Sequence, residues 1–92
     1  MTETNIHSSE NRRRRLLFRA THRGTHETDL LIGGYVSARL HALSDADMDA
    51  LEELMELPDT DLADWLTGRL PIPAQYDSPM LRALRAAAQE RA

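Results

Sequence analysis

Apolar positions recur three and four residues apart along most of the chain, and glycine, proline or polar residues interrupt them at short intervals. The first such face consists of Leu16, Leu17 and Ala20, which predicts a helix from about Ser9 to His22. Gly24 is expected to end it, because glycine readily takes the left-handed conformation that follows a helix.

The second segment, HETDLLIGGYVSARLHAL at residues 26–43, is ambiguous. LLI-GG-YV has the form of a two-residue β-hairpin, and two glycines inside a helix cost roughly 1 kcal/mol each relative to alanine. The strands of such a hairpin would be very short, however, and a lone two-stranded hairpin is marginal in water. Leu31, Tyr35 and Ala38 follow a helical spacing. We therefore expect a helix in which the glycines allow close packing against a neighbour.

Three more helices follow. Ser44 and Asp47 form a capping-box pattern before an apolar face made of Met48, Leu51, Leu54 and Met55, with Leu57 as a further candidate, and Pro58 is expected to end that helix. DTDLADWLTG predicts a short helix capped by Asp59 or Thr60, stopped by Gly68 and buried through Trp65. Ser78-Pro79 is a favoured helix start, after which the buried stripe is Met80, Leu81, Leu84 and Ala88.

The sum is an all-α fold, a small five-helix bundle with short loops. Residues 1–8 are polar and are expected to form a disordered leader, and residues 9–92 a single helical domain. The sequence has no cysteine, no apolar run long enough to span a bilayer and no secretory signal pattern. Glu3 and Glu10 in a short leader argue against an arginine-rich mitochondrial presequence, so we expect a cytoplasmic bacterial protein without membrane insertion and not one of the mitochondrial matrix.

Charge is distributed unevenly. All 11 cationic side chains are arginines, and the run Arg12–Arg15 makes the first quarter basic. From Asp45 to Asp64 there are nine carboxylates and no cation. Such a bipolar chain suits a partner with its own charge pattern, because complementary charges set orientation and encounter rate, although a merely solvated surface explains the charges equally well.

The residues that carry catalytic chemistry are missing. His22 and His26 have the i, i+4 spacing of a zinc pair, but Gly24 lies between them and places them on different helices. No thiol, nucleophile motif or glycine-rich phosphate loop occurs. We therefore expect no catalytic residue, no metal site and no enzyme.

The alternative function is a small helical regulator that binds nucleic acid through the arginine run. Two helices joined through a glycine support it. Against it, a recognition helix needs cations or amides at its leading end, and here that end carries Glu27 and Asp29. The acidic pI of about 5.5 also argues against nucleic acid as the partner.

Arg23, Gly24 and Glu27 form an R-G-x-x-E pattern at the joint between the first two predicted helices. Helix physics alone explains much of it, since a cation favours a helix C-terminus and an anion an N-terminus, and the two side chains are close enough to pair across the turn. The other interpretation is a surface that serves binding and not folding. The residues alone favour the structural interpretation.

Three blocks change that balance: HRGTHETDLLIGGYV, ALSDADMDALEELMELPDTDLADWLTG and a final amphipathic helix. In this order they resemble the succinate dehydrogenase assembly factors, the flavinylation factors of bacteria and mitochondria, over roughly residues 12–90. The family signature R-G-x-x-E falls on Arg23, Gly24 and Glu27, and its acidic-capped tryptophan helix falls on Trp65. The arginine leader is heavier than is usual in that family.

The resemblance implies a helical bundle that binds the flavoprotein subunit of succinate dehydrogenase, and in bacteria also that of fumarate reductase. Such a factor promotes covalent attachment of FAD to a histidine of that subunit, while holding no cofactor itself. The resemblance also implies that Arg23, Gly24 and Glu27 contact the flavoprotein. In that role Arg23 is expected to donate hydrogen bonds to the partner, and Gly24 to let the two chains approach closely.

Overall fold

The computed structural model describes the backbone of residues 2–91 and the side chains of residues 9–90. Within that part the chain forms five α-helices and two short 3-10 helices, with no strand. Their bounds are α1 Thr2–Thr21, α2 His26–Arg39, η1 Leu40–Ala42, α3 Asp45–Leu54, α4 Asp59–Thr67, η2 Ala74–Tyr76 and α5 Pro79–Arg91. The predicted all-α, five-helix architecture is confirmed.

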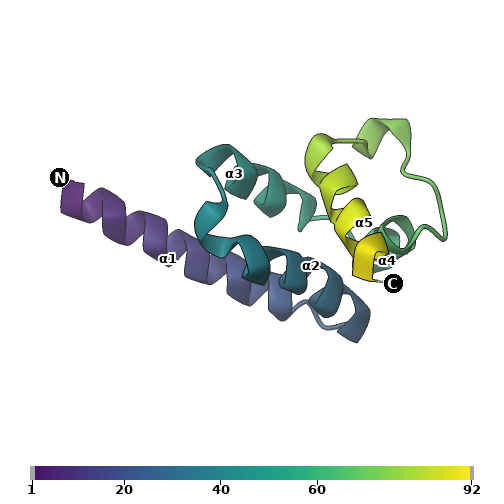
Figure 1. Cartoon of the computed structure of the whole chain (residues 1–92), viewed down its shortest axis with the longest axis horizontal. Coiled ribbons are helices and arrows are strands. Elements are labelled where there is room, and N and C mark those ends of the chain that lie inside the picture. The colour runs from purple at the N-terminus through teal and green to yellow at the C-terminus, as the bar shows by residue number, and fades with distance from the viewer. Residues whose placement is uncertain (1, 92) are drawn as a thin grey trace.

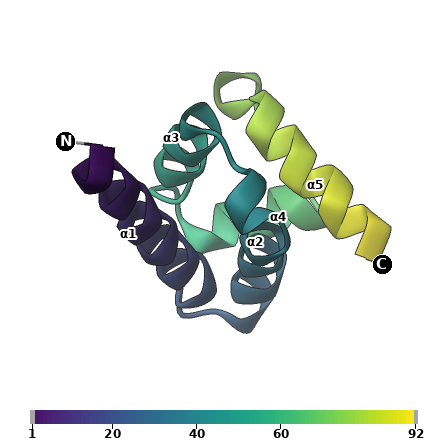
Figure 2. The same ribbon diagram turned by 60° about the vertical axis from the view of Figure 1, so that its left-hand side comes forward.

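The helix α2 is the centre of the arrangement. It runs back along α1 after a tight turn, and α4 and α5 pack against it on the side away from α1 (Figures 1 and 2). The helix α3 bridges α1 and α5. The fully buried Ile32 and Val36 of α2 join a common core with Leu16, Ala20, Leu43, Met48, Leu51, Leu54, Met55, Leu62, Trp65, Leu66, Met80, Leu81 and Leu84. No helix in the described residues is both long enough and apolar enough to cross a membrane.

The glycine pair lies inside α2, so the helical interpretation is confirmed and the hairpin excluded. Gly33 is buried against the last turn of α1. A Cβ there would lie 2.7 Å from Thr21 Cγ2 and 3.2 Å from the carbonyl oxygen of Ala20. The backbones of α1 and α2 therefore approach too closely for any larger residue without a shift, which offsets the poor helix propensity of glycine.

The backbone of α1 is helical from Thr2, well before the predicted start at Ser9. The early start of the helix has a simple cause, since residues 1–23 contain neither glycine nor proline and nothing in the leader interrupts a helix. The side chains of residues 1–8 lie outside the described part of the chain. The prediction of a disordered leader falls on them, and it stays a prediction.

The capping box at α3 is confirmed in both directions. The backbone N–H of Asp47 donates to Ser44 Oγ at 3.0 Å, and the backbone N–H of Ser44 donates to Asp47 Oδ2 at 3.0 Å. The predicted cap of α4 is wrong. Pro58 is the N-cap residue and supplies no side-chain hydrogen bond, while Asp59 is the first helical residue. Its carboxylate is bound to an arginine elsewhere in the chain, as described below.

The end of α4 and the start of α5 follow the prediction. Gly68 ends α4 in the left-handed conformation with φ +81°, and the backbone N–H of Leu81 donates to Ser78 Oγ at 3.1 Å at the start of α5. Trp65 is 6% exposed, and its ring stacks on that of Tyr76, with centroids 5.3 Å apart. The tryptophan is therefore part of the core, as predicted. Ala88 is only half-buried, so the apolar stripe of α5 weakens toward its end.

The basic first quarter pairs with the acidic stretch inside the molecule. Arg12 of α1 donates from Nε and Nη2 to the two carboxylate oxygens of Glu52, at 3.0 and 2.9 Å, and also binds Asp49. Arg19, two turns further on, pairs with Glu56 at 2.6 Å. The hydrogen bonds from Arg12 hold the pKa of Glu52 below its ordinary value. These bonds fix α3 alongside α1.

Trp65→Ala is expected to lower the free energy of unfolding by about 3 to 5 kcal/mol, because it leaves a large cavity in a small core. Tyr76→Ala is the matched control. Tyr76 is 40% exposed, so its loss is expected to cost only about 1 kcal/mol. Urea unfolding followed by circular dichroism measures both. Equal, small losses would show that the tryptophan is not a core residue.

The Arg12–Glu52 pair predicts a pH dependence. Because the folded-state pKa of Glu52 lies below its ordinary value of 4.5, the pair stabilises the fold fully above that pH. Its contribution is lost as the pH falls through the folded-state pKa. Glu52→Gln should therefore lower unfolding free energy at pH 7 by about 1 kcal/mol or less, given partial exposure, and by progressively less in acid.

Glu53→Gln is the control for this measurement, because Glu53 is exposed and forms no ion pair with any residue whose side chain is described. Urea unfolding of wild type and both variants between pH 3 and pH 7 gives the comparison. A Glu52→Gln effect that does not change over this range would contradict the assignment.

Candidate functional site

The candidate site is the turn between α1 and α2, where the chain reverses direction and α2 starts back along α1 (Figure 1). Thr25 is the N-cap of α2, with extended backbone and a hydroxyl that accepts from the N–H of Thr28 at 3.4 Å. The hydroxyl groups of Thr25 and Thr28 also bind each other, and Thr28 is fully buried. The start of α2 is thus fixed from within, by a cap that the sequence analysis did not identify.

Arg23 lies in this turn, and its guanidinium points inward. Nε donates to Asp59 Oδ1 at 2.5 Å, Nη1 to the carbonyl oxygen of Met55 at 2.8 Å, and Nη2 to that of Leu57 at 2.9 Å. The side chain is only 10% exposed. The backbone N–H of Arg23 donates to Asp29 Oδ1 at 2.6 Å. One residue therefore joins the α1–α2 turn to the α3–α4 turn.

This geometry corrects two expectations about Arg23. It does not pair with Glu27 across the turn, because Asp59 already holds it. It also has a structural role, because it donates to carbonyls at the end of α3 and pairs with a partly buried carboxylate. Whether it also contacts a partner stays a prediction, but its guanidinium nitrogens all donate within the chain.

Gly24 has the positive φ that its predicted role required, although α1 ends three residues earlier, at Thr21. Its φ is +104°, a region that side-chain-bearing residues rarely adopt, and the residue is exposed. A Cβ built there meets no described atom within 4 Å. The backbone at this position is therefore open to a partner, and the cost of any substitution within the chain is one of backbone conformation and not of collision.

Glu27 is in the first turn of α2, with its side chain 46% exposed. Its Oε1 accepts from Nη2 of Arg69 at 2.9 Å, and Nε of Arg69 donates to Asp64 Oδ1 at 3.1 Å. Arg69 follows α4 directly after Gly68, so the pair connects α2 to the end of α4. The hydrogen bonds to Glu27 and then to Asp64 raise the pKa of Arg69.

The three motif residues thus divide into two groups. Gly24 and Glu27 lie on the surface, and Arg23 lies behind them as an internal connection. The partners of these residues, which were not predicted from the sequence, are Asp29, Asp59 and Arg69. Asp59 was noticed only as a helix cap, and nothing in the local sequence marks Arg69, because its partner Glu27 is 42 positions away.

The arginine run is also partly used within the chain. Arg12 binds α3, and Nη1 of Arg13 donates to the carbonyl oxygen of Leu40 at 2.6 Å. Arg14 and Arg15 are exposed. With half of the run engaged internally, the structure gives no support to the nucleic-acid alternative.

His22 and His26 are exposed, and the ring of His22 stacks on Phe18 with centroids 4.0 Å apart. Among the described residues no group of three or more histidine, aspartate or glutamate side chains is arranged to hold a metal ion.

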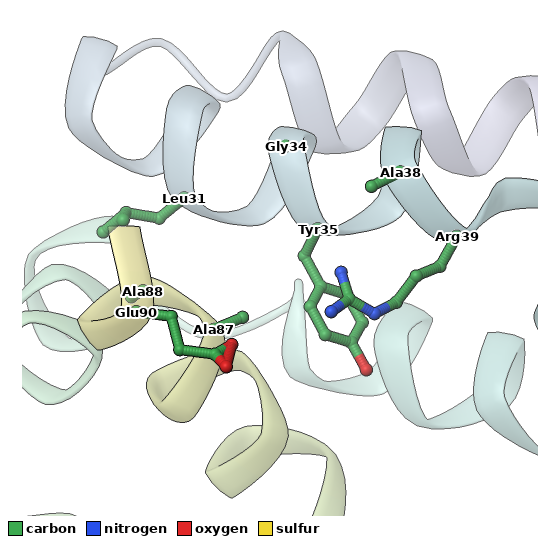
Figure 3. Close-up of a pocket in the computed structure, with 8 residues that line it drawn as sticks. All are labelled: Leu31, Gly34, Tyr35, Ala38, Arg39, Ala87, Ala88 and Glu90. Atoms are coloured by element: carbon green, nitrogen blue, oxygen red, sulfur yellow. The ribbon is translucent and has the colours of Figure 1, made fainter. Parts of the chain in front are cut away.

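A separate hollow of about 310 Å³ lies between α2 and the end of α5 (Figure 3). The guanidinium of Arg39 covers the ring of Tyr35 at 4.1 Å from its centroid, and Ala87 and Glu90 face them from α5. Leu31, Gly34, Ala38 and Ala88 complete the lining. None of the three motif residues reaches it, so the hollow and the turn are distinct features.

Comparison with known proteins identifies the family. Residues 14–88 match the family described as flavinator of succinate dehydrogenase. The chain is 54% identical over 71 residues to the FAD assembly factor SdhE of Acetobacter pasteurianus, covering 77% of this chain and 65% of the relative. It is 40% identical over 82 residues to the FAD assembly factor SdhE of Ralstonia nicotianae, covering 88% and 85%.

A mitochondrial relative matches over a shorter stretch. The succinate dehydrogenase assembly factor 2 of Mycosarcoma maydis is 42% identical over 62 residues, which cover 67% of this chain and 26% of that protein. This chain thus spans less than two thirds of the length of several of the relatives that it matches. No solved structure matches. With a family match across most of its length, the chain belongs to the flavinators of succinate dehydrogenase.

Proposed function

We propose that this protein is an assembly factor that binds the flavoprotein subunit of succinate dehydrogenase and promotes covalent attachment of FAD to it. The observation that carries the proposal is the family match over residues 14–88, which contains the whole α1–α2 turn and the helices that position it. Two bacterial relatives, 54% and 40% identical to this chain, are named FAD assembly factors. The flavoprotein of fumarate reductase is a second target of the same class.

The mechanism that fits this structure is conformational and involves no catalytic residue of this chain. Covalent attachment requires the flavin and its histidine acceptor to be held in a reactive geometry within the flavoprotein. A small rigid bundle that binds one arrangement of the flavoprotein better than others shifts the population toward it. FAD stays on the partner, and this chain contributes the shape and charge of a docking surface, acting in the bacterial cytoplasm.

Rigidity is the property that the described contacts supply. The turn is tied at one side to the start of α2 by Asp29 and at the other to α3 and α4 by the guanidinium of Arg23. Gly24 and Glu27 are therefore displayed from a fixed frame. A surface held in its bound conformation loses less entropy on association than a mobile loop does.

The proposal is tested by producing the flavoprotein subunit in cells that lack their own assembly factor, with and without this protein. Covalent flavin is read as in-gel fluorescence after denaturing electrophoresis. We expect fluorescence to rise several-fold when this protein is present. Equal fluorescence with and without it, in cells where both proteins accumulate in folded form, would refute the function.

Alanine substitutions at Arg23 and Glu27 are expected to differ in their effect on stability. Arg23→Ala should lower the free energy of unfolding by about 2 to 3 kcal/mol, because it strands a partly buried carboxylate and two carbonyls. For a domain of this size the melting temperature should fall by roughly 10 °C or more. Glu27→Ala should move it by only a few degrees, because its ion pair is exposed.

Thermal melts and covalent flavin are measured on the same two variants. Glu27→Ala should lose flavinylation while folded, and flavinylation by Arg23→Ala should recover at temperatures where that variant is folded. A stable Arg23→Ala protein with no activity would instead assign Arg23 a direct contact with the partner.

Gly24 gives a third test, since a Cβ there meets nothing inside the chain. Gly24→Ala and Gly24→Leu should share about the same conformational cost, roughly 1 to 2 kcal/mol, because both must adopt a positive φ. Gly24→Asn should cost less, because asparagine enters that region more readily. Binding to the flavoprotein should fall with side-chain size, least for alanine and most for leucine. Binding that follows stability alone would reduce Gly24 to a turn residue.

A further inference from the structure

We propose that Arg69, in the loop after α4, is the cation that the docking surface presents to the flavoprotein, and that Arg23 is a positioning residue behind it. This inference rests on the proposed function and adds a residue outside the R-G-x-x-E pattern. Arg23 was expected to be the cation at the surface around Gly24 and Glu27, but its side chain is almost buried, so another residue must supply a cation there.

Exposure separates the two arginines. The side chain of Arg69 is 54% exposed, whereas that of Arg23 is 10% exposed. A residue must lie at the surface to contact a partner that docks against an unchanged fold. Arg23 would have to leave Asp59 and two backbone carbonyls to do so, and each of those groups would then lose its hydrogen bond. Arg69 can contact a partner without any rearrangement of the fold.

The remaining hydrogen-bonding capacity of Arg69 leads to the same conclusion. Nε is used by Asp64 and one N–H of Nη2 by Glu27, but Nη1 donates to no residue in the described part of the chain. A guanidinium carries five N–H donors in a planar fork, so the N–H groups of Nη1 can still donate to an acceptor on a partner. The strongest fit is a carboxylate of the flavoprotein, because charge-assisted hydrogen bonds to arginine favour that geometry.

Arg69 also fixes the carboxylate of Glu27. Bound to Arg69 at 2.9 Å, Glu27 has one oriented oxygen, Oε1, and a second oxygen, Oε2, that accepts no hydrogen bond from any residue in the described part of the chain. The pair thus offers a partner an acceptor beside a donor, next to the open backbone of Gly24. Such a patch fits a flavoprotein surface with a carboxylate facing Arg69 and an N–H donor facing Glu27, and the alternation of charge fixes orientation.

The test is the affinity of this protein for the purified flavoprotein subunit, measured by isothermal titration calorimetry. Arg69→Ala is expected to weaken binding by about tenfold or more, as truncating a central charged contact does at protein interfaces. Arg82→Ala is the matched control, because Arg82 is another exposed arginine, 64% exposed against 54% for Arg69, and it pairs with Asp77 at 3.0 Å. It should bind like wild type.

A charge exchange separates contact from simple pairing. The double variant Glu27→Arg with Arg69→Glu keeps an ion pair between α2 and the loop but reverses the charges shown to the partner. It should bind as weakly as Arg69→Ala or more so. All affinities are measured at a temperature at which circular dichroism shows every variant folded.

The outcomes are distinct. Wild-type affinity in Arg69→Ala, equal losses in Arg69→Ala and Arg82→Ala, or full binding by the charge-exchanged protein would each overturn the assignment of Arg69. Failure of the wild type itself to bind or to raise covalent flavin would overturn the proposed function, and the inference with it.

Discussion

The contact on which the rest of the structure depends is the guanidinium of Arg23 between the two turns. It donates hydrogen bonds to the carbonyl oxygens of Met55 and Leu57, just after α3, and to the carboxylate of Asp59 at the start of α4. A helix C-terminus carries partial negative charge and orphan carbonyls, so a cation is the natural group to place there. A single side chain therefore fixes the exit of one helix, the entry of the next and the turn from which it comes.

That contact also explains why a surface motif contains a nearly buried residue. The function proposed here needs Gly24 and Glu27 to be held still, and a turn of four residues outside the regular helices would otherwise be mobile. Fastening the turn through Arg23 and Asp29 makes its conformation part of the cooperative fold. Loss of function therefore has a different meaning in each motif variant. Removing Arg23 disturbs the conformation of the turn, whereas removing Glu27 changes only the surface that the turn exposes.

Much of the fold was predictable because its signals are local. Ser44 with Asp47, Gly68 and Ser78 with Pro79 act within one turn of the chain, and each begins or ends a helix where expected. Apart from the Thr25 cap of α2, the contacts of the site that escaped prediction were non-local. Asp59 was assigned to a cap because its sequence context favours one, but Arg23, 36 positions earlier, takes its carboxylate. The pairing of Glu27 with Arg69 has no sequence signal for the same reason, since charges far apart in the chain can pair in many ways.

The charge pattern gains its meaning from these pairings. A basic first quarter and an acidic middle suggested a surface divided by charge, yet Arg12, Arg19 and Arg23 are all joined to carboxylates of the acidic stretch. Half of the arginines in the first quarter thus fasten α1 and its turn to α3 and α4. Glu27 and Arg69 stand apart from that set, because their pair is exposed on both sides and links the motif to the end of α4. Long-range attraction to a partner then comes from few groups, which makes the placement of each one more consequential than net charge.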